Sequence, residues 1–122
     1  MRIISYENFP NVRVVSNCEA EIEAIFRKCR KNSYLAWYER NLLALSLSGR
    51  SAIKRPSFAI LSDGLYEMRK TKDLNPRILF QFLENDLVIL LCAFQKKDEA
   101  DYKIYCQKAN NRLKLLKEME YL

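Results

Sequence analysis

The chain has 122 residues and is 49% hydrophobic, which is enough for one compact domain with its own core. Only two glycines and three prolines are present, and this argues against a disordered or loop-dominated chain. The 21 lysines and arginines outnumber 15 acidic residues and give a net charge of +6, which favours an anionic partner such as nucleic acid, an acidic protein or an anionic surface.

Residues 2–6 and 12–15 are β-branched runs on either side of the turn-like sequence NFPN, and they predict one strand or an irregular hairpin. A helix follows, because Ser16 with Glu19 three residues later has the pattern of a capping box. Apolar residues then recur at helical spacing, at Cys18, Ile22, Ile25, Phe26 and Cys29.

A second helix is expected to be capped by Asn32 or Ser33 and to end at Gly49, because glycine readily adopts the left-handed conformation that terminates helices. Its apolar positions are expected at Leu35, Tyr38, Leu42, Leu45 and Leu47.

The second half of the chain predicts strands and a last helix. A basic connector at residues 50–56 leads into strands at 58–62, 64–69, 77–83 and 87–94. The last of these is apolar throughout, which indicates a central strand buried on both faces.

Asp98 is expected to cap a final helix that runs to about residue 120. Its apolar stripe is Tyr105, Ala109, Leu113 and Leu116, and its solvated positions are Lys103, Lys108, Arg112 and Lys117. The order of elements predicts a single α+β domain over residues 1–122, with the helices on one side of a small antiparallel sheet.

The sequence gives little support for a membrane protein or for a metal-binding protein. The N-terminus lacks the apolar core of a signal peptide, and the longest apolar run, residues 87–94, is far shorter than the roughly 20 residues that a membrane helix needs. The chain has no histidine, and its four cysteines form no Cys-x-x-Cys pair, so neither a metal nor a small-molecule cofactor is expected. The cysteines are expected to be reduced core residues of a cytoplasmic protein.

Residues 64–82 predict a charged hairpin, and residues 50–77 carry most of the basic excess. Alternation along the strands puts Ile78, Phe80 and Phe82 on one face, and it gathers Glu67, Arg69 and Arg77 on the other. We expect this second face to be exposed to solvent.

Five short motifs in chain order carry a family resemblance. They are LLALSLSG from Leu42, DGLYEMR at residues 63–69 (close to GLYELR), Arg77-Ile78, FQKK at residues 94–97, and Ala109-x-x-Arg112. Over roughly residues 42–115 the chain resembles the RelE/ParE superfamily of toxins from bacterial toxin–antitoxin pairs, and in particular its HigB-like, phage-derived branch.

The resemblance implies a RelE-like fold and an enzyme that cuts messenger RNA on the ribosome, neutralised by an antitoxin of helix-turn-helix type. Such cleavage uses the RNA 2′-hydroxyl as the nucleophile on the adjacent phosphate and needs no metal. It requires positive charge around the phosphate and protonation of the leaving oxygen.

The candidate catalytic residues follow from that chemistry. Arg69 and Arg77 suit bidentate gripping of phosphate oxygens, whereas arginine cannot act as a base. Lys96 and Lys97 can neutralise the transition state, and one of them could exchange a proton. Tyr102 could stack on a base or donate a proton, and Glu67 is a base or an ion-pair partner of Arg69. The expected RNA-binding residues are Lys54, Arg55, Lys70 and Lys72.

Plainer interpretations stay open. The hairpin charges could be ordinary cross-strand ion pairs, the two lysines could be merely solvated, and Tyr102 could pack against the sheet. Tyr34, Trp37 and Tyr38 could stack on bases, although a place in the core or facing the antitoxin is favoured. Two other functions remain: a ParE-like inhibitor of DNA gyrase, and a nucleic-acid-binding member of the same fold that has lost catalysis, which the acidic stretch at residues 98–101 would suit.

Overall fold

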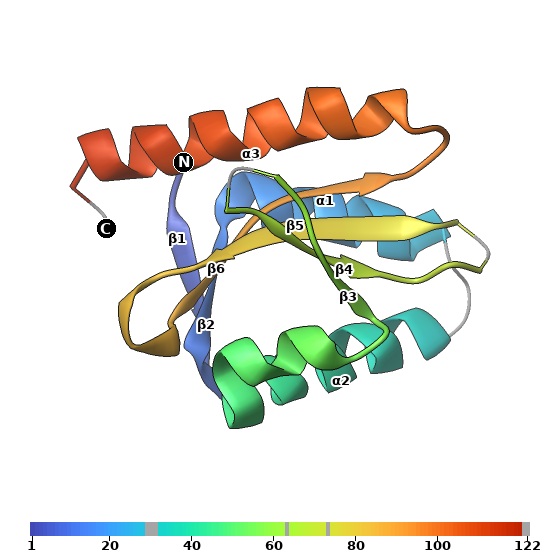
Figure 1. The fold of residues 1–122 in the computed structure, drawn as a ribbon, viewed down its shortest axis with the longest axis horizontal. Helices are drawn as coiled ribbons and strands as arrows, with labels where there is room; N and C mark the ends of the chain where they lie inside the picture. Colours follow the sequence, from blue (N-terminus) through green and yellow to red (C-terminus); the bar gives the residue numbers. More distant parts are fainter. Residues whose placement is uncertain (29–31, 63, 73, 121–122) are drawn as a thin grey trace.

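The computed structural model describes residues 1–28, 32–62, 64–72 and 74–120. Within that part of the chain, a six-stranded sheet in the order β1-β2-β6-β5-β4-β3 is covered by the helices α1, α2 and α3 (Figure 1). The expected α+β class is therefore confirmed. None of the described helices is both long and apolar enough to cross a membrane.

The N-terminal segment is an irregular hairpin of β1 (Ile3–Tyr6) and β2 (Phe9–Val15), whose register shifts between Ser5 and Tyr6. Helix α1 (Ser16–Lys28) begins at the predicted residue. The Arg2 amide donates to Ser16 Oγ at 3.0 Å, and the Ser16 amide donates to the Arg2 carbonyl at 2.8 Å. These reciprocal bonds join the start of α1 to the residue that precedes β1. Cys29, expected in this helix, lies outside the described residues.

The sheet is mixed, so the expectation of a purely antiparallel sheet is wrong. The strands β3 (Phe58–Ile60), β4 (Tyr66–Arg69), β5 (Pro76–Phe82) and β6 (Val88–Gln95) form an antiparallel series. Strand β2 then pairs in parallel with β6, through Val12–Val14 against Val88–Leu90. Strand β6 is central and buried from Val88 to Phe94, as predicted, and the hairpin adds to its second edge.

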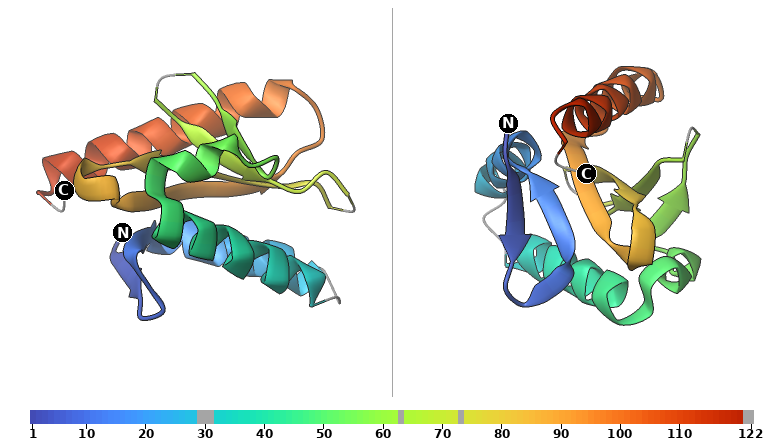
Figure 2. Two further views of the ribbon diagram at one scale, coloured as in Figure 1. Left: turned by 60° about the horizontal axis from the view of Figure 1, so that its bottom comes forward. Right: turned by 90° about the vertical axis from the view of Figure 1, so that its left-hand side faces the viewer.

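Helices α2 and α3 lie on opposite faces of the sheet, so the expectation that all helices share one side is also wrong (Figure 2). Helix α3 packs on β5 and β6, α2 packs on β2, and α1 packs on β6 and β2. The physical reason lies in the central strands: β6 is buried on both faces, and so is β5 from Pro76 to Phe80. A sheet that is apolar on both sides needs cover on both sides.

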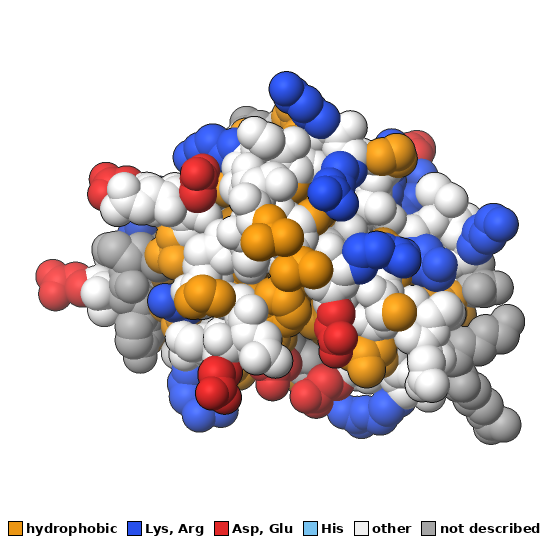
Figure 3. All heavy atoms as spheres, turned by 90° about the horizontal axis from the view of Figure 1, so that it is seen from below, with side chains coloured by type: hydrophobic (Ala, Val, Ile, Leu, Met, Phe, Trp, Pro, Cys, Tyr) orange, Lys and Arg blue, Asp and Glu red, His pale blue; other side chains and the backbone are white. Residues whose placement is uncertain are grey.

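Helix α2 (Ser33–Ser48) buries a different stripe from the one predicted. Tyr38, Leu42 and Leu45 are buried as expected, but Leu35 and Leu47 are 49% and 78% exposed. The aromatic rings of Tyr34 and Trp37 take the inward positions instead, because they remove more apolar surface from water than leucines do. Seen from the side of α2, apolar side chains gather across the middle of the exposed face (Figure 3).

Gly49 ends α2 as predicted, with φ of 54°, and a 3-10 turn from Gly49 to Lys54 follows. A Cβ atom at Gly49 would lie 2.8 Å from the Asp86 carboxylate, which belongs to the 3-10 turn Glu84–Asp86 before β6. The helix end and this turn are thus in close contact, and only glycine fits there without displacement.

Helix α3 (Ala100–Glu118) buries Ala109, Leu113 and Leu116 as predicted, and Tyr105 stacks on Phe94 with ring centroids 4.2 Å apart. Asp98 caps it, since Asp98 Oδ1 accepts from the Ala100 amide at 2.8 Å.

Arg112 is not solvated as expected, because it makes a bidentate ion pair with Glu21 of α1 at 2.8 Å. Strand β6 runs past the end of its pairing with β2, which leaves backbone groups at its edge. Arg112 donates to the Leu91 carbonyl at 2.8 Å, and Glu21 accepts from the Ala93 amide at 3.1 Å. The pair therefore completes the sheet edge and joins α1 to α3.

Candidate functional site

The charged hairpin is built as predicted, but its charged face is covered. Strands β4 and β5 pair with Glu67 opposite Leu79 and Arg69 opposite Arg77. Glu67 is 2% exposed and Arg77 is 5% exposed, so the expectation that both face solvent is wrong. Alternation assigns them to one face, as the sequence shows, but α3 packs over that face. Arg69 alone of the three keeps a substantially exposed side chain, at 41%.

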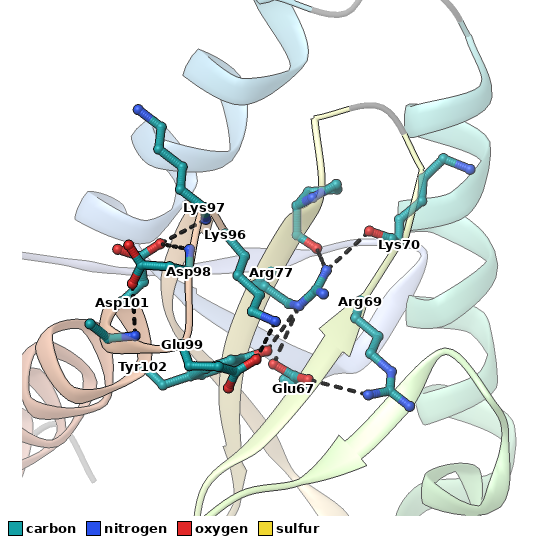
Figure 4. A network of polar contacts seen from close by, with 12 residues as sticks. Glu67, Arg69, Lys70, Arg77, Lys96, Lys97, Asp98, Glu99, Asp101 and Tyr102 are labelled. Carbon is teal, nitrogen blue, oxygen red and sulfur yellow. Dashed lines mark hydrogen bonds and ion pairs between the residues drawn. The ribbon is translucent and has the colours of Figure 1, made fainter.

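The Glu67 carboxylate lies between the two guanidinium groups (Figure 4). Its Oε1 is 3.8 Å from Arg69 Nη1, and its Oε2 is 3.7 Å from Arg77 Nε. These separations are ion pairs without hydrogen bonds, and Glu67 Oε2 is buried with no hydrogen-bond partner among the described residues. The carboxylate thus balances both arginines while keeping an open acceptor.

The Arg77 side chain links α3 to strands β4 and β5 through hydrogen bonds. Its Nε donates to the Tyr102 hydroxyl at 3.0 Å, and its Nη1 donates to the carbonyls of Lys70 and Pro76 at 3.0 and 3.1 Å. These bonds tie α3 to the two strands at the base of the β4–β5 turn. In this arrangement the guanidinium holds protein groups, and only a rearrangement would turn it toward a phosphate.

Tyr102 is the point where the buried network reaches the surface. Burial raises the pKa of Tyr102 above its usual value; the hydrogen bond from Arg77 opposes that shift and the Glu67 carboxylate reinforces it. Since the hydroxyl accepts from Arg77, its own proton remains available for donation. Tyr102 is therefore a neutral, half-buried proton donor at physiological pH, and its ring also packs edge-on against Phe94.

The lysine pair at the start of α3 separates in the structure. Lys96 Nζ approaches Glu99 Oε1 at 2.5 Å and lies 5.5 Å from the centre of the Tyr102 ring. Lys97 points away from Glu67 (Figure 4). Of the two, Lys96 joins the site, and Lys97 faces solvent.

The acidic stretch before α3 has a structural role. Asp101 Oδ2 accepts from the amides of Lys97 and Asp98 at 2.7 and 3.1 Å, and these two bonds lower the pKa of Asp101. Together with Asp98, which bonds the Ala100 amide, it satisfies donors that the first turn of a helix leaves unpaired. Asp98 and Asp101, which belong to the stretch that would suit a member without catalysis, therefore have a structural role at the start of α3.

The expected RNA-binding residues lie around Arg69. Lys72 is exposed in the β4–β5 turn, and Lys70 Nζ sits 5.6 Å from the centre of the Tyr34 ring. Lys54 and Arg55 are exposed in the connector, close in sequence to Ser57, whose carbonyl accepts from the Arg69 amide at 2.8 Å. The basic turn and the basic connector therefore flank the strand end that carries Arg69.

Helix α2 positions this hairpin through residues whose role the sequence did not reveal. Trp37 Nε1 donates to the Arg69 carbonyl at 3.1 Å, and the Tyr34 hydroxyl accepts from the Leu74 amide at 3.1 Å. Tyr34, Trp37 and Tyr38 are all buried, so they belong to the core and do not form a surface for stacking bases. The only signal in the sequence was their clustering at helical spacing.

Among the described residues, no group of three or more cysteine, aspartate or glutamate side chains is arranged to hold a metal ion. Cys18 and Cys92 are buried thiols, and Cys106 is half-buried. Burial raises the pKa of the Cys18 thiol well above its usual value and that of Cys92 to about 12. Neither buried thiol is therefore ionised at physiological pH.

Fold and site define a basic α+β domain in which Arg69, Lys96 and Tyr102 border a buried glutamate–arginine pair. The chain belongs to the phage-derived protein Gp49-like family (DUF891), whose profile it matches over residues 33–114. This is a RelE/HigB-like toxin family, and the resemblance is confirmed at that level. The matched region runs from the first residue of α2 into α3 and includes every candidate site residue. A comparison with curated proteins found no match.

Proposed function

We propose that this protein is the toxin of a toxin–antitoxin pair and an endoribonuclease that cuts messenger RNA, on the ribosome, by metal-independent attack of the 2′-hydroxyl. The observation that carries the proposal is the convergence of Arg69, Lys96 and Tyr102 where β4 and β6 end, with Tyr102 held by Arg77 at 3.0 Å. Two cations and a neutral proton donor are what this reaction requires of an enzyme without histidine.

In the proposed reaction, Arg69 and Lys96 bind the scissile phosphate and stabilise the charge that develops on it. The 2′ oxygen forms a bond to phosphorus, its proton passes to water, and the bond from phosphorus to the 5′ oxygen breaks. Tyr102 donates its proton to that leaving oxygen and regains one from water. Arg77 is a positioning residue, and Glu67, at 2% exposure, orients the two arginines rather than touching RNA.

The partner of this toxin is proposed to be an antitoxin, of the helix-turn-helix type that the resemblance implies. The exposed face of α2 supports a protein partner, since Leu35, Leu43 and Leu47 are 49%, 48% and 78% exposed on one side of the helix. Apolar side chains gathered on a surface mark sites of protein interaction.

The test is a reconstituted translation reaction with purified protein, in which the ends of the messenger RNA are mapped. Wild-type protein should produce defined cuts, and Arg69→Ala should remove them. Arg40→Ala is the matched control, because Arg40 is an exposed arginine of α2 outside the site. Uncut RNA together with inhibition of DNA supercoiling by gyrase would instead identify a ParE-like inhibitor.

One observation favours a second candidate, a nucleic-acid-binding member of the fold without catalysis. Glu67 neutralises Arg69 and Arg77, and Glu99 pairs with Lys96, so each cation of the site already has an acidic neighbour. This candidate predicts RNA binding without any cut and no growth arrest when the protein is expressed alone.

A further inference from the structure

A pocket of about 400 Å³ lies beside the candidate site, between α3 and the segment that follows β3. Tyr102 belongs to both: its hydroxyl accepts from Arg77, and its side chain lines the pocket. The pocket is therefore next to the position proposed for the scissile phosphate. It is lined by Ser62, Tyr102, Lys103, Cys106, Gln107 and Asn110.

The chemistry of the lining fits a nucleobase. Gln107 and Asn110 each present an amide with both a donor and an acceptor, and Ser62 adds a hydroxyl. Within the described part of the chain these side-chain groups have no hydrogen-bond partner, so they are open to a ligand. The edges of unpaired bases carry donors and acceptors side by side, and proteins that read single-stranded RNA pair with those edges.

We propose that this pocket receives one nucleobase of single-stranded RNA, adjacent to the phosphate at the candidate site, and that Asn110 and Gln107 read its edge. Lys103, at the rim, contacts a neighbouring phosphate. The inference rests on the proposed function for its substrate, and it deepens that function by naming the residues that set base preference.

The chain offers a matched pair of variants. Asn110 lines this pocket, whereas the next residue, Asn111, lines a neighbouring pocket that shares only Gln107 with it. Asn110→Ala and Asn111→Ala therefore remove the same amide from adjacent positions of one helix. Both residues are at least partly exposed, so neither variant should disturb the fold.

The probe is a set of short single-stranded oligonucleotides with 2′-O-methyl riboses, one for each base, whose binding is followed by fluorescence anisotropy. These cannot be cut, because the attacking hydroxyl is blocked. Wild-type protein should prefer one base. Asn110→Ala should reduce that preference about tenfold, as expected for the loss of one base-edge contact, and Asn111→Ala should leave it unchanged. Asn110→Asp, which replaces a donor with an acceptor, should shift the preference to another base.

Three results would overturn the inference. They are equal effects of the two alanine variants, an absence of base preference in the wild type, and a loss at Asn110→Ala confined to binding of the antitoxin. Because binding is measured without cleavage, the two proposals fail separately. A base preference that depends on Asn110 in a protein that cuts nothing would support the pocket and refute the nuclease.

Discussion

Arg69 and Arg77 are cross-strand partners of the same residue type, and the structure predicts opposite consequences for their replacement by alanine. Arg77→Ala removes three hydrogen bonds, to Tyr102, Lys70 and Pro76. It also leaves the Glu67 carboxylate, which is 2% exposed, with only the half-exposed Arg69 at 3.8 Å as an ion-pair partner.

Removing one member of a buried ion pair costs about 3–5 kcal/mol, so we expect a loss of that size in the free energy of unfolding of Arg77→Ala. Arg69→Ala removes a side chain that is 41% exposed and makes no hydrogen bond through its guanidinium to the described residues, and its cost should be about 1 kcal/mol or less. The difference between the variants is therefore about 2–4 kcal/mol.

Urea unfolding followed by circular dichroism measures both values. The double variant Glu67→Gln, Arg77→Ala tests the cause, because a neutral amide no longer needs a buried counter-charge. It should be more stable than Arg77→Ala alone by about 1–2 kcal/mol. If Arg77→Ala and Arg69→Ala unfold at the same urea concentration, or if Glu67→Gln restores nothing, the buried network does not carry this energy.

Arg112→Ala should lower the free energy of unfolding in urea by about 2–4 kcal/mol, because it removes the hydrogen bond to the Leu91 carbonyl of β6 and the ion-pair partner of Glu21. The exposed Lys114→Ala should change it by no more than about 0.5 kcal/mol, and equal values for the two variants would contradict the role of the ion pair. Tyr102→Phe should reduce cleavage by about 10²-fold or more, and a fold-intact variant that cuts normally would remove Tyr102 from the reaction. The pH–rate profile should show no inflection near pH 6.5, since the chain has no histidine. Because the pKa of Tyr102 is raised above 10.0, the activity that needs its proton should persist at neutral pH and be lost only as the pH rises beyond about 10. The stability linked to this proton should be lost over the same pH range. RNA binding should weaken steeply as the salt concentration rises, and a salt-independent affinity would rule out the basic surface. The slope of the logarithm of the binding constant against the logarithm of the salt concentration should fall by about 0.7 for each alanine replacement at Lys54, Arg55, Lys70 or Lys72.

Much of the secondary structure was predictable, because its signals are local. The end of α2 at Gly49 and the central position of β6 follow from a left-handed glycine and an uninterrupted apolar run. The capping-box pattern also predicted the start of α1 at Ser16, although the Ser16 hydroxyl accepts from the Arg2 amide. Strands β1, β3, β4 and β5 begin and end within two residues of their predicted limits, whereas β2 begins three residues earlier than predicted, at Phe9. Strand and helix ends depend on small energies. The motif order likewise identified the family, since the spacing of residues along the chain is a property of the sequence.

Burial of the site was not predictable, because it depends on which elements meet. Alternation correctly put Glu67 and Arg77 on the same face of the hairpin, but a period of two does not say whether that face meets solvent or a helix. In the same way, Arg112 has the spacing of a solvated residue, yet it pairs with Glu21, 91 residues away. The pair lies where β6 extends beyond its pairing with β2.

By itself, then, the sequence determined the elements, the charged hairpin and the family, all of which depend on nearest neighbours and on spacing. The tertiary structure decided the parallel addition of β2 to β6, the covering of both faces of the sheet, and the division of the candidate residues into exposed Arg69 and buried Arg77. The physical reason is that desolvation acts on the assembled layers: a charge is buried or exposed according to what packs over it, and that contact forms between segments far apart in the chain.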